Sequence, residues 1–230
     1  MARLLEKMRS GKPCLIVSIP TNSVEEALAA QAGGADAVKV HSNVTHHATG
    51  LTFGTLEQEE PRLRAIVKAV TIPVGLVPGE TLDLTHDFFE RVHDIGMDMV
   101  DAFAQFMPAL IYRVEGVDLA AATDSTYTWD EIQAVASLPW VEAIECAKVP
   151  TAEYGTYLSW RDLAYYAGLT RLLHKPIIVP TQRKIRLEDV PALLSVGVKN
   201  IMIGAIVTGR KAADIERVTR EFRQAMDASA

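Results

Sequence analysis

Residues 33–41 of the chain are Gly-Gly-Ala-Asp-Ala-Val-Lys-Val-His, and the fold prediction starts from this stretch. A glycine pair of the kind that ends a helix is followed by a turn and by a short apolar run typical of a β-strand. The same order recurs at 96–100 (Gly-Met-Asp-Met-Val) and at 197–201 (Gly-Val-Lys-Asn-Ile). The recurrence predicts repeated units in which parallel strands alternate with helices.

Extending this pattern outward predicts eight strands, each followed by a helix. The strands are expected at 14–19, 37–41, 72–77, 99–103, 117–122, 141–146, 177–179 and 200–203. Helices are expected at 23–32, 57–70, 85–94, 129–136, 160–174, 187–195 and 213–228. This arrangement predicts an α/β fold, a single (β/α)8 TIM barrel that occupies residues 1–230 as one domain. An open doubly wound sheet has the same local pattern and stays as the structural alternative.

The composition limits the class of partner. The net charge of the 230 residues is −6, whereas a nucleic-acid-binding surface is basic. No apolar stretch reaches the length of a membrane span or of a signal-peptide core. Cys14 and Cys146 lie in apolar runs, as buried thiols do in a reducing compartment. We therefore expect a cytoplasmic protein with a small-molecule substrate and without nucleic-acid or membrane partners, and a homo-oligomer is compatible with the sequence.

Two of the expected strand-to-helix connections are long, at 42–56 and 147–159, whereas the helix-to-strand connections are mostly short. Long loops within a compact domain usually bind a ligand or cover a site. In this type of barrel the strand-to-helix loops gather at the carboxyl ends of the strands, where active sites are built. The asymmetry predicts an enzyme whose site lies at that end.

The strand expected at 37–41 is predicted to carry two polar side chains into the barrel. Side chains alternate between the two faces of a strand, and Val38 and Val40 suit the outer face, which packs against helices. Lys39 and His41 then point inward, near the upper end of the barrel. A buried lysine is unfavourable unless it is paired or chemically used. Lys39 is therefore expected to be either a catalytic residue or a salt-bridged structural one.

Four carboxylates could complete the site with Lys39: Glu145, which is favoured, Asp101, and Asp118 and Asp124, which flank the fifth strand. Glu145 shares its strand face with the small residues Ala143 and Ala147, which leave room for a ligand, and Asp101 lies near the end of the fourth strand. A lysine beside a carboxylate can move a proton next to a carbonyl group, and a lysine can also form a Schiff base. The candidate catalytic residues are therefore Lys39, Glu145, His41 and Asp101.

Three histidines, His41, His46 and His47, lie at the start of one long connection. Adjacent His46 and His47 cannot both face one ion from a regular element, and the sequence has no His-x-His or His-Glu-x-x-His motif. The sequence therefore predicts no metal site and no cofactor, without excluding a metal.

The carboxyl-terminal quarter contains the predicted phosphate site. The eighth strand ends in Gly204-Ala205-Ile206, where glycine lets backbone N–H groups approach a phosphate and a short helix-like segment follows. The seventh strand is followed by two donors and two cations. The loops after strands seven and eight are the usual phosphate position in this barrel. The candidate substrate- or phosphate-binding residues are Thr181, Gln182, Arg183, Lys184, Gly204, Ala205 and Ile206.

Over the whole chain this architecture resembles the phosphate-binding (β/α)8 barrels, a group that includes ribulose-phosphate-binding enzymes, N-acetylmannosamine-6-phosphate epimerase and several aldolases. The motifs that carry the resemblance are Gly204-Ala205-Ile206 and the turn Gly34-Ala35-Asp36. Such families usually have a glycine pair after strand seven, where this chain has Thr181-Gln182-Arg183, so side chains would take over part of the phosphate contact. The third strand also lacks the catalytic lysine that an epimerase of this kind carries there. The resemblance implies a sugar-phosphate epimerase, isomerase or aldolase-type lyase.

The sequence thus favours an enzyme that acts on a small phosphorylated sugar or carbonyl compound, by lysine–carboxylate proton transfer or by Schiff-base chemistry. Two other functions stay open. One is a transferase for a prenyl or other phosphate substrate, with the apolar segment 103–112 lining a groove. The other is a non-catalytic ligand-binding barrel in which Lys39 only pairs with a carboxylate.

Overall fold

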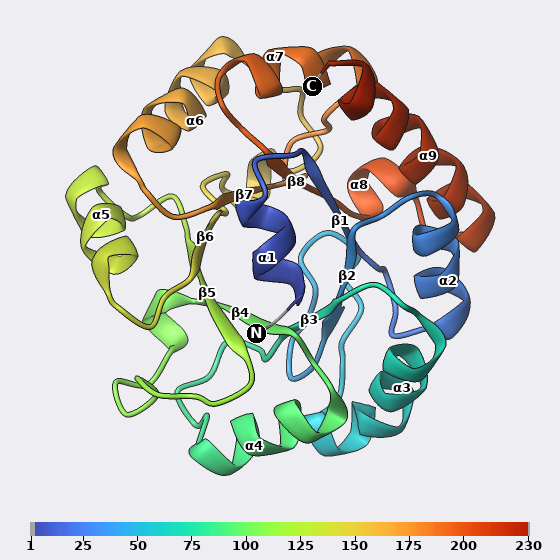
Figure 1. The fold of residues 1–230 in the computed structure, drawn as a ribbon, viewed down its shortest axis with the longest axis vertical. Helices are drawn as coiled ribbons and strands as arrows, with labels where there is room; N and C mark the ends of the chain where they lie inside the picture. The colour runs from blue at the N-terminus through green and yellow to red at the C-terminus, as the bar shows by residue number, and fades with distance from the viewer. Residues whose placement is uncertain (1–2, 230) are drawn as a thin grey trace.

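The computed structural model describes residues 3–229 and confirms the predicted barrel. Eight parallel strands, each hydrogen bonded to the next, form a closed sheet because β8 also pairs with β1 (Figure 1). The strands are β1 (Cys14–Ser18), β2 (Ala37–His41), β3 (Val74–Val77), β4 (Met99–Phe103), β5 (Asp118–Thr123), β6 (Ala143–Cys146), β7 (Ile177–Pro180) and β8 (Asn200–Ile203). Every strand expected from the sequence is present, with ends that differ by no more than two residues.

Helices surround the barrel on its outside (Figure 1). They are α2 (Val24–Ala32), α3 (Leu56–Ala69), α4 (His86–Ile95), α5 (Trp129–Ser137), α6 (Trp160–Leu172), α7 (Val190–Ser195), α8 (Ala205–Thr208) and α9 (Ala212–Ala228). The expectation of a helix after every strand is wrong at β4, which is followed only by the 3-10 turn η1 (Ala104–Phe106). Pro108 explains this, because a proline disfavours the helical conformation in the residue before it. The apolar segment 103–112 is therefore not a helix.

Capping side chains fix where the helices after the two long loops begin. Thr55 and Ser159 each accept a hydrogen bond from the backbone N–H three residues on, and the side chains of Gln58 and Asp162 accept from the N–H groups of the caps in return. These reciprocal bonds satisfy N–H groups that have no partner at the start of a helix. The loops at 42–55 and 147–159 therefore end at defined points above the barrel.

The strand register sorts the inward side chains into layers. Lys39 on β2 aligns, through β3, with Met99 on β4, and Asp101 lies two residues beyond Met99. The same advance of two residues leads from Asp101 to Glu145 on β6, from Glu145 to Met202 on β8, and from Met202 back to Lys39. These residues form one layer of four side chains from the even-numbered strands, as this type of barrel requires.

The same register assigns the neighbouring layers. The layer directly above Lys39 comes from the odd-numbered strands and consists of Ser18, Val77, Ala122 and Pro180. The uppermost layer consists of His41, Phe103, Ala147 and Gly204. The two layers below Lys39 consist of Ile16, Gly75, Ala120 and Ile178, and then of Ala37, Met99, Ala143 and Asn200. The polar and open part of the interior therefore begins at the layer of Lys39.

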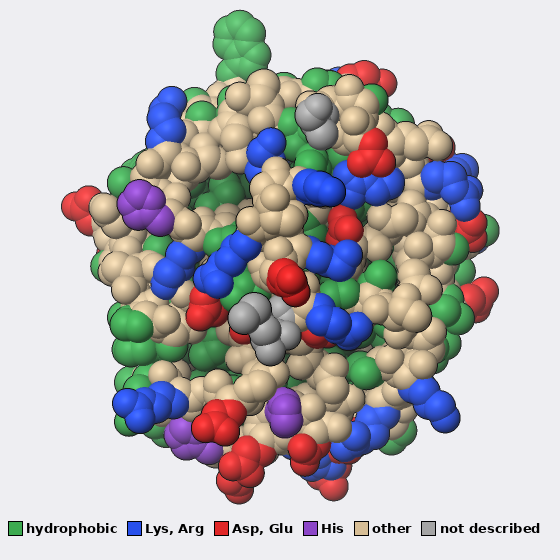
Figure 2. Space-filling model, in the orientation of Figure 1, with side chains coloured by type: hydrophobic (Ala, Val, Ile, Leu, Met, Phe, Trp, Pro, Cys, Tyr) green, Lys and Arg blue, Asp and Glu red, His purple; other side chains and the backbone are tan. Residues whose placement is uncertain are grey.

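The short helix α1 (Arg3–Arg9), which the sequence did not predict, closes the lower end of the barrel. It lies across the barrel centre in Figure 1, and its residues Leu4, Leu5 and Met8 are buried against the lower layers. Arg3 fixes the helix by donating to both carboxylate oxygens of Asp98, each at 3.1 Å. Charged side chains of both signs are scattered over this face (Figure 2). Within residues 3–229, no helix has both the length and the apolar character needed to span a bilayer.

Candidate active site

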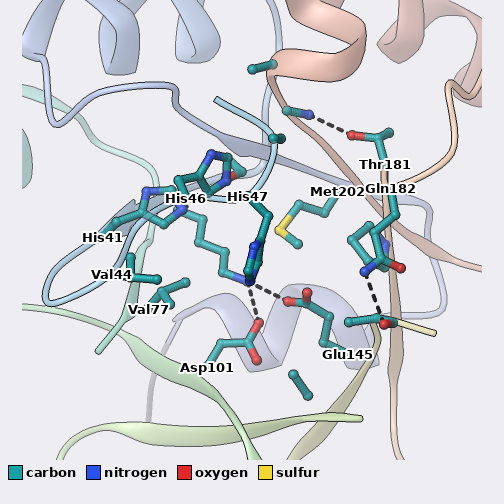
Figure 3. Close-up of a pocket in the computed structure, with 18 of the residues that line it drawn as sticks. His41, Val44, His46, His47, Val77, Asp101, Glu145, Thr181, Gln182 and Met202 are labelled. Carbon is teal, nitrogen blue, oxygen red and sulfur yellow. Dashed lines mark hydrogen bonds and ion pairs between the residues drawn. The ribbon is translucent and has the colours of Figure 1, made fainter. Parts of the chain in front are cut away.

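The upper end of the barrel contains a pocket, and every residue of the three upper layers lines it. Figure 3 shows five of them with labels: His41, Val77, Asp101, Glu145 and Met202. The surrounding loops complete the wall with Val44, His46, His47, Ala48, Gly79, Glu80, Tyr154, Thr181, Gln182, Ala205 and Ile206. The cavity measures about 130 Å³, which is on the order of the space that accepts a benzene-sized molecule. The pocket therefore suits a small ligand or the reacting end of a larger one.

Lys39 lies at the floor of this pocket between two carboxyl groups. Its Nζ donates to Asp101 Oδ2 at 2.8 Å and to Glu145 Oε2 at 2.5 Å, and Figure 3 shows both groups pointing toward the same nitrogen. The exposed fractions are 8% for Lys39, 5% for Asp101 and 7% for Glu145. Three of the four candidate catalytic residues are thus in direct contact, although they come from three different strands.

The pKa values of the three groups are driven apart. Burial opposes the charge of Lys39, but the adjacent Asp101 and Glu145 outweigh it and raise the pKa of the ammonium above its usual value. Burial, and next the charge of Asp101, raises the pKa of Glu145 to about 8. Burial also acts on Asp101, but the charge of Lys39 and hydrogen bonds hold its pKa below the usual value. At neutral pH the cluster therefore contains an ammonium, a carboxylate and a carboxylic acid.

His41, the fourth candidate, lies two layers above Lys39 on the same strand. Its Nε2 is 3.3 Å from Ser18 Oγ. The ring stacks on Phe53 with centroids 4.9 Å apart and meets the edge of His46 at 4.6 Å. Burial, followed by His46 and Lys39, lowers the pKa of His41 well below its usual value. The imidazole is therefore neutral at physiological pH.

The backbone of His41 is held by the side chain of Asn22, which follows β1. Asn22 accepts from the His41 N–H at 3.1 Å and donates to the His41 carbonyl at 2.7 Å. It also donates to Glu59 of α3 at 2.9 Å, and Glu59 accepts from the N–H of Gly54 at 3.1 Å. The end of β2 and the end of its long loop are thus tied together by buried polar groups.

Thr181 joins the ends of β7 and β8. Its Oγ1 accepts from the N–H of Gly204 at 3.0 Å, so the expectation that this N–H faces a phosphate is corrected. Ala205 and Ile206 are the first residues of α8 and line the pocket. The N–H groups of the first residues of a helix have no partner within it, so these two remain candidate phosphate contacts.

Gln182 lines the pocket but uses its amide on the loop after β6. Its Nε2 donates to the Ala147 carbonyl at 3.0 Å and to Tyr154 Oη at 2.7 Å, and its Oε1 accepts from Val149 N–H at 3.0 Å. Gln182 therefore holds the loop after β6 against β7.

Arg183 and Lys184 do not line this pocket. Arg183 turns outward and pairs with Glu153 at 2.8 Å and with Asp162 at 3.4 Å, while Lys184 is exposed to solvent. The two cations were expected to hold a phosphate together with Gly204. In the structure both lie outside this pocket, because β7 ends at Pro180 and strand alternation no longer fixes which way the following side chains point.

The loop after β2 folds back over the pocket as a small hairpin, in which Thr45 and Thr52 form an antiparallel bridge. From its tip, His47 Nε2 contacts Glu80 Oε1 at 3.2 Å, and the His47 ring lies 6.4 Å from that of Tyr154. The hairpin approaches the loop after β3 so closely that a side chain at Gly79, which has a φ of +99°, would collide with the Asn43 carbonyl.

Ser18, Glu80 and Tyr154 also line the pocket, although the sequence did not identify them as site residues. Ser18 is the polar exception in the apolar run of β1, and its inward position follows from alternation with the buried Ile16. Glu80 and Tyr154 lie on loops, where no periodic signal exists. Over residues 3–229, no group of three or more His, Cys, Asp or Glu side chains is arranged to hold a metal ion.

No protein-family model and no curated protein matches the sequence. The fold, in contrast, is similar to many solved structures. Thiamine phosphate pyrophosphorylase from Pyrococcus furiosus aligns with a TM-score of 0.65 and 12% identity, over 96% of this chain and 98% of that one. Phosphoribosyl anthranilate isomerase from Thermus thermophilus aligns with a TM-score of 0.67 and 15% identity, over 94% and 98% of the two chains.

A third structure is (S)-3-O-geranylgeranylglyceryl phosphate synthase from Thermoplasma acidophilum in complex with its substrate sn-glycerol-1-phosphate. It aligns with a TM-score of 0.61 and 16% identity, over 98% of this chain and 97% of that one. At these identities the likeness shows the fold alone. All three names contain a phosphorylated compound, and what the likeness confirms is the barrel architecture that these proteins share with the chain.

Proposed function

We propose that this barrel is an enzyme that transfers a proton next to the carbonyl group of a small phosphorylated compound, as an isomerase or epimerase does. The observation that carries the proposal is the cluster of Lys39, Asp101 and Glu145 at the floor of the pocket, in which Nζ lies 2.8 Å and 2.5 Å from the two carboxyl groups. Groups whose environments drive their pKa values apart are suited to separate acid and base roles.

The roles follow from the charge of each group. Asp101 is ionised and lines the pocket, so it acts as the base that removes the proton from carbon. Glu145, with a pKa of about 8, supplies a proton. The ammonium of Lys39 stabilises the negative charge that develops on the carbonyl oxygen.

Schiff-base chemistry is the less favoured alternative for Lys39. A Schiff base forms from a neutral amine, and catalytic lysines of that type have a lowered pKa. The two carboxyl groups raise the pKa of Lys39 instead. The aldolase-type lyase that requires such a lysine is therefore the second choice, and we favour proton transfer.

A phosphorylated substrate is favoured by the position of the pocket. It reaches the loops after β7 and β8, where Ala205 and Ile206 line its wall, and this is the usual phosphate position of the barrel. The three structural neighbours whose names contain phosphate compounds support the same substrate class. Thr181 contributes by fixing Gly204 at the start of this turn.

The test is exchange of a carbon-bound proton with D₂O, followed by NMR, with D-ribulose 5-phosphate and N-acetylmannosamine 6-phosphate as probes. General acid–base groups contribute about 10²–10⁴-fold to rate, so Lys39→Met, Asp101→Asn and Glu145→Gln should each lower the exchange rate by at least about 10²-fold. A matched control is Lys175→Met, since Lys175 lies in the connection before β7 and donates to the Leu138 carbonyl at 2.7 Å.

Two results would count against the proposal. Exchange of either sugar phosphate that persists in all three cluster variants would remove the cluster from the reaction. Borohydride trapping that links a probe covalently to Lys39 would replace proton transfer by Schiff-base chemistry.

A further inference from the structure

Ser18 and His41 form a second pair of polar side chains in the pocket, on the wall beside Lys39. Ser18 is the register partner of Lys39 on the adjacent strand β1, so both side chains point into the barrel next to one another. Ser18 is 7% exposed and His41 is 2% exposed. The mechanism derived above does not use either residue.

The hydrogen bond between them leaves the serine hydroxyl free to donate. His41 Nδ1 is buried and has no hydrogen-bond partner within the described part of the chain. A buried N–H without a partner is rarer in proteins than an acceptor without one, so the proton of the neutral ring belongs on Nε2. Nε2–H then donates to Ser18 Oγ at 3.3 Å, and the Ser18 O–H is available to another acceptor.

Lys39 has a free donor on the same wall. An ammonium group carries three N–H donors, and Asp101 and Glu145 accept two of them. The third N–H of Lys39 and the O–H of Ser18 come from register-paired residues of neighbouring strands, with Ser18 in the layer directly above Lys39. Two donors side by side suit one oxygen atom that gains negative charge.

Gly204 keeps this wall accessible. A Cβ at position 204 would lie 3.5 Å from Ser18 Cβ and 3.9 Å from Ser18 Oγ, which is ordinary contact rather than a clash. The glycine, at a φ of −150°, therefore adopts a conformation open to any residue. What its missing side chain provides is space next to the serine hydroxyl.

We propose that the Ser18 hydroxyl and the third N–H of Lys39 form a two-donor site for an anionic oxygen of the substrate, and that His41 is the positioning residue that orients Ser18. The ligand class is a phosphorylated compound with a carboxylate, or with an enolate formed during reaction, next to the phosphate-bearing carbon. The proposal rests on the proposed function for the role of that oxygen. Its two donors come from the neighbouring strands β1 and β2.

The test measures binding of 2-phosphoglycolate, whose carboxylate imitates the charged oxygen, by isothermal titration calorimetry. A hydrogen bond to a charged group is worth about 1.5–3 kcal/mol, so Ser18→Ala should weaken binding by at least about tenfold. The matched control is Ser42→Ala, because Ser42 is a fully buried serine directly after His41 that does not line the pocket. Its affinity should equal that of the parent.

His41 variants test positioning separately from packing. His41→Gln retains an N–H near the place of Nε2, whereas His41→Leu removes it. We expect His41→Leu to weaken 2-phosphoglycolate binding by about threefold or more and His41→Gln to restore most of it, in line with a neutral hydrogen bond worth about 1 kcal/mol. Loss of affinity that is equal in both variants would leave His41 with a structural role only.

The inference fails independently of the proposed function. If Ser18→Ala binds 2-phosphoglycolate within about twofold of the parent, the two-donor site is overturned, even if the cluster variants abolish exchange. A twofold change in affinity is smaller than the loss expected when a hydrogen bond to a charged group is removed. No binding by the parent at millimolar concentrations also overturns it. Conversely, a binding loss in Ser18→Ala together with unaltered exchange in the cluster variants would sink the proposed function and leave the anion site standing.

Discussion

Met99 and Asp101 lie two residues apart on β4 and point into the same barrel, but their surroundings differ completely. Met99 is 2% exposed among apolar side chains below, whereas Asp101 contacts the Lys39 ammonium at 2.8 Å. Two steps of the layer pattern separate an interior that is closed by α1 from one that opens to a pocket. The lower part contributes packing, and the upper part contributes chemistry.

The two parts depend on one another. Burial is the largest single influence on the pKa of Glu145 and of Lys39, and the layer directly below them, with Ile16 and Ile178, has no polar side chain. Water is therefore excluded from beneath the cluster. This burial is the largest cause that raises the pKa of the Glu145 carboxyl group to about 8. The apolar layers are thus a condition of the acid–base chemistry above.

The largest effect is expected for Lys39→Met, in the upper part. Activity should fall by about 10²–10⁴-fold. Removing one partner of a buried ion pair also costs about 3–5 kcal/mol, because two carboxyl groups then remain buried without a cation. Chemical denaturation at pH 7 measures this loss.

The stability of Lys39→Met should depend on pH in a defined sense. Without the ammonium, the pKa values of both carboxyl groups lie above those of the unfolded chain, so the folded state loses stability as pH rises above about 4. The difference from the parent is then largest near neutrality and shrinks toward pH 4. A penalty that stays constant from pH 4 to 8 would mean that lost packing, not charge, destabilises the variant.

Met99→Ala should produce the opposite pattern in the lower part. Truncating a buried methionine leaves a cavity and costs about 2–5 kcal/mol, and Met99 is fully enclosed. Exchange activity per folded molecule should stay within about threefold of the parent, since no polar group of the pocket is altered. The denaturation midpoint and the exchange rate are measured on the same preparation. If activity fell as strongly as in Lys39→Met, the division between a packing part and a chemical part of the barrel would be wrong.

A smaller effect is expected in the pH profile. Glu145 must hold its proton to act as an acid, so kcat/KM should decline as pH rises through about 8. The charge of Asp101 is one cause of that raised pKa, so Asp101→Asn should shift the titration of Glu145 to lower pH. ¹³C NMR of labelled glutamate detects this shift without activity, and an unchanged titration would show that burial acts alone.

The smallest effect is expected for Lys184→Ala. Lys184 lies at the upper end of the barrel but is exposed and outside the pocket. Exposed charges are screened by salt, so inorganic phosphate should bind within about twofold of the parent. A marked, salt-dependent loss of phosphate binding would mean that the whole upper rim, and not the inner layers alone, makes the ligand site.

Where the backbone is regular, the sequence predicts the direction of a side chain correctly. The alternation of side chains along β2 correctly predicted that Lys39 and His41 point into the barrel. The sequence also identified Glu145 and Asp101 as carboxylates that could reach the barrel interior. It could not predict their contact, because the two carboxylates are 62 and 106 positions away from Lys39. Only the register of four further strands, β3 to β6, brings them together. That register is set by barrel closure, which no local pattern records.

The errors lie where the backbone leaves the strands. Arg183 was assigned to a phosphate because it follows β7, but it faces Glu153 and Asp162 outside the pocket. The N–H of Gly204 was assigned to a ligand, yet Thr181 accepts it. The helix α1 was missed because it has only seven residues and is stabilised by packing on the barrel rather than by its own sequence pattern.

The two-residue advance between alternate strands distributes the residues of the Lys39 layer over the two halves of the barrel. β1–β4 carry Lys39 and Asp101, whereas β5–β8 carry Glu145 and Met202. Half a barrel made of β1–β4 alone would hold an ammonium beside one carboxylate and would lack Glu145, the group that supplies the proton. Glu145 lies on the second half, so full proton-transfer activity is expected only when both halves are joined in the closed barrel.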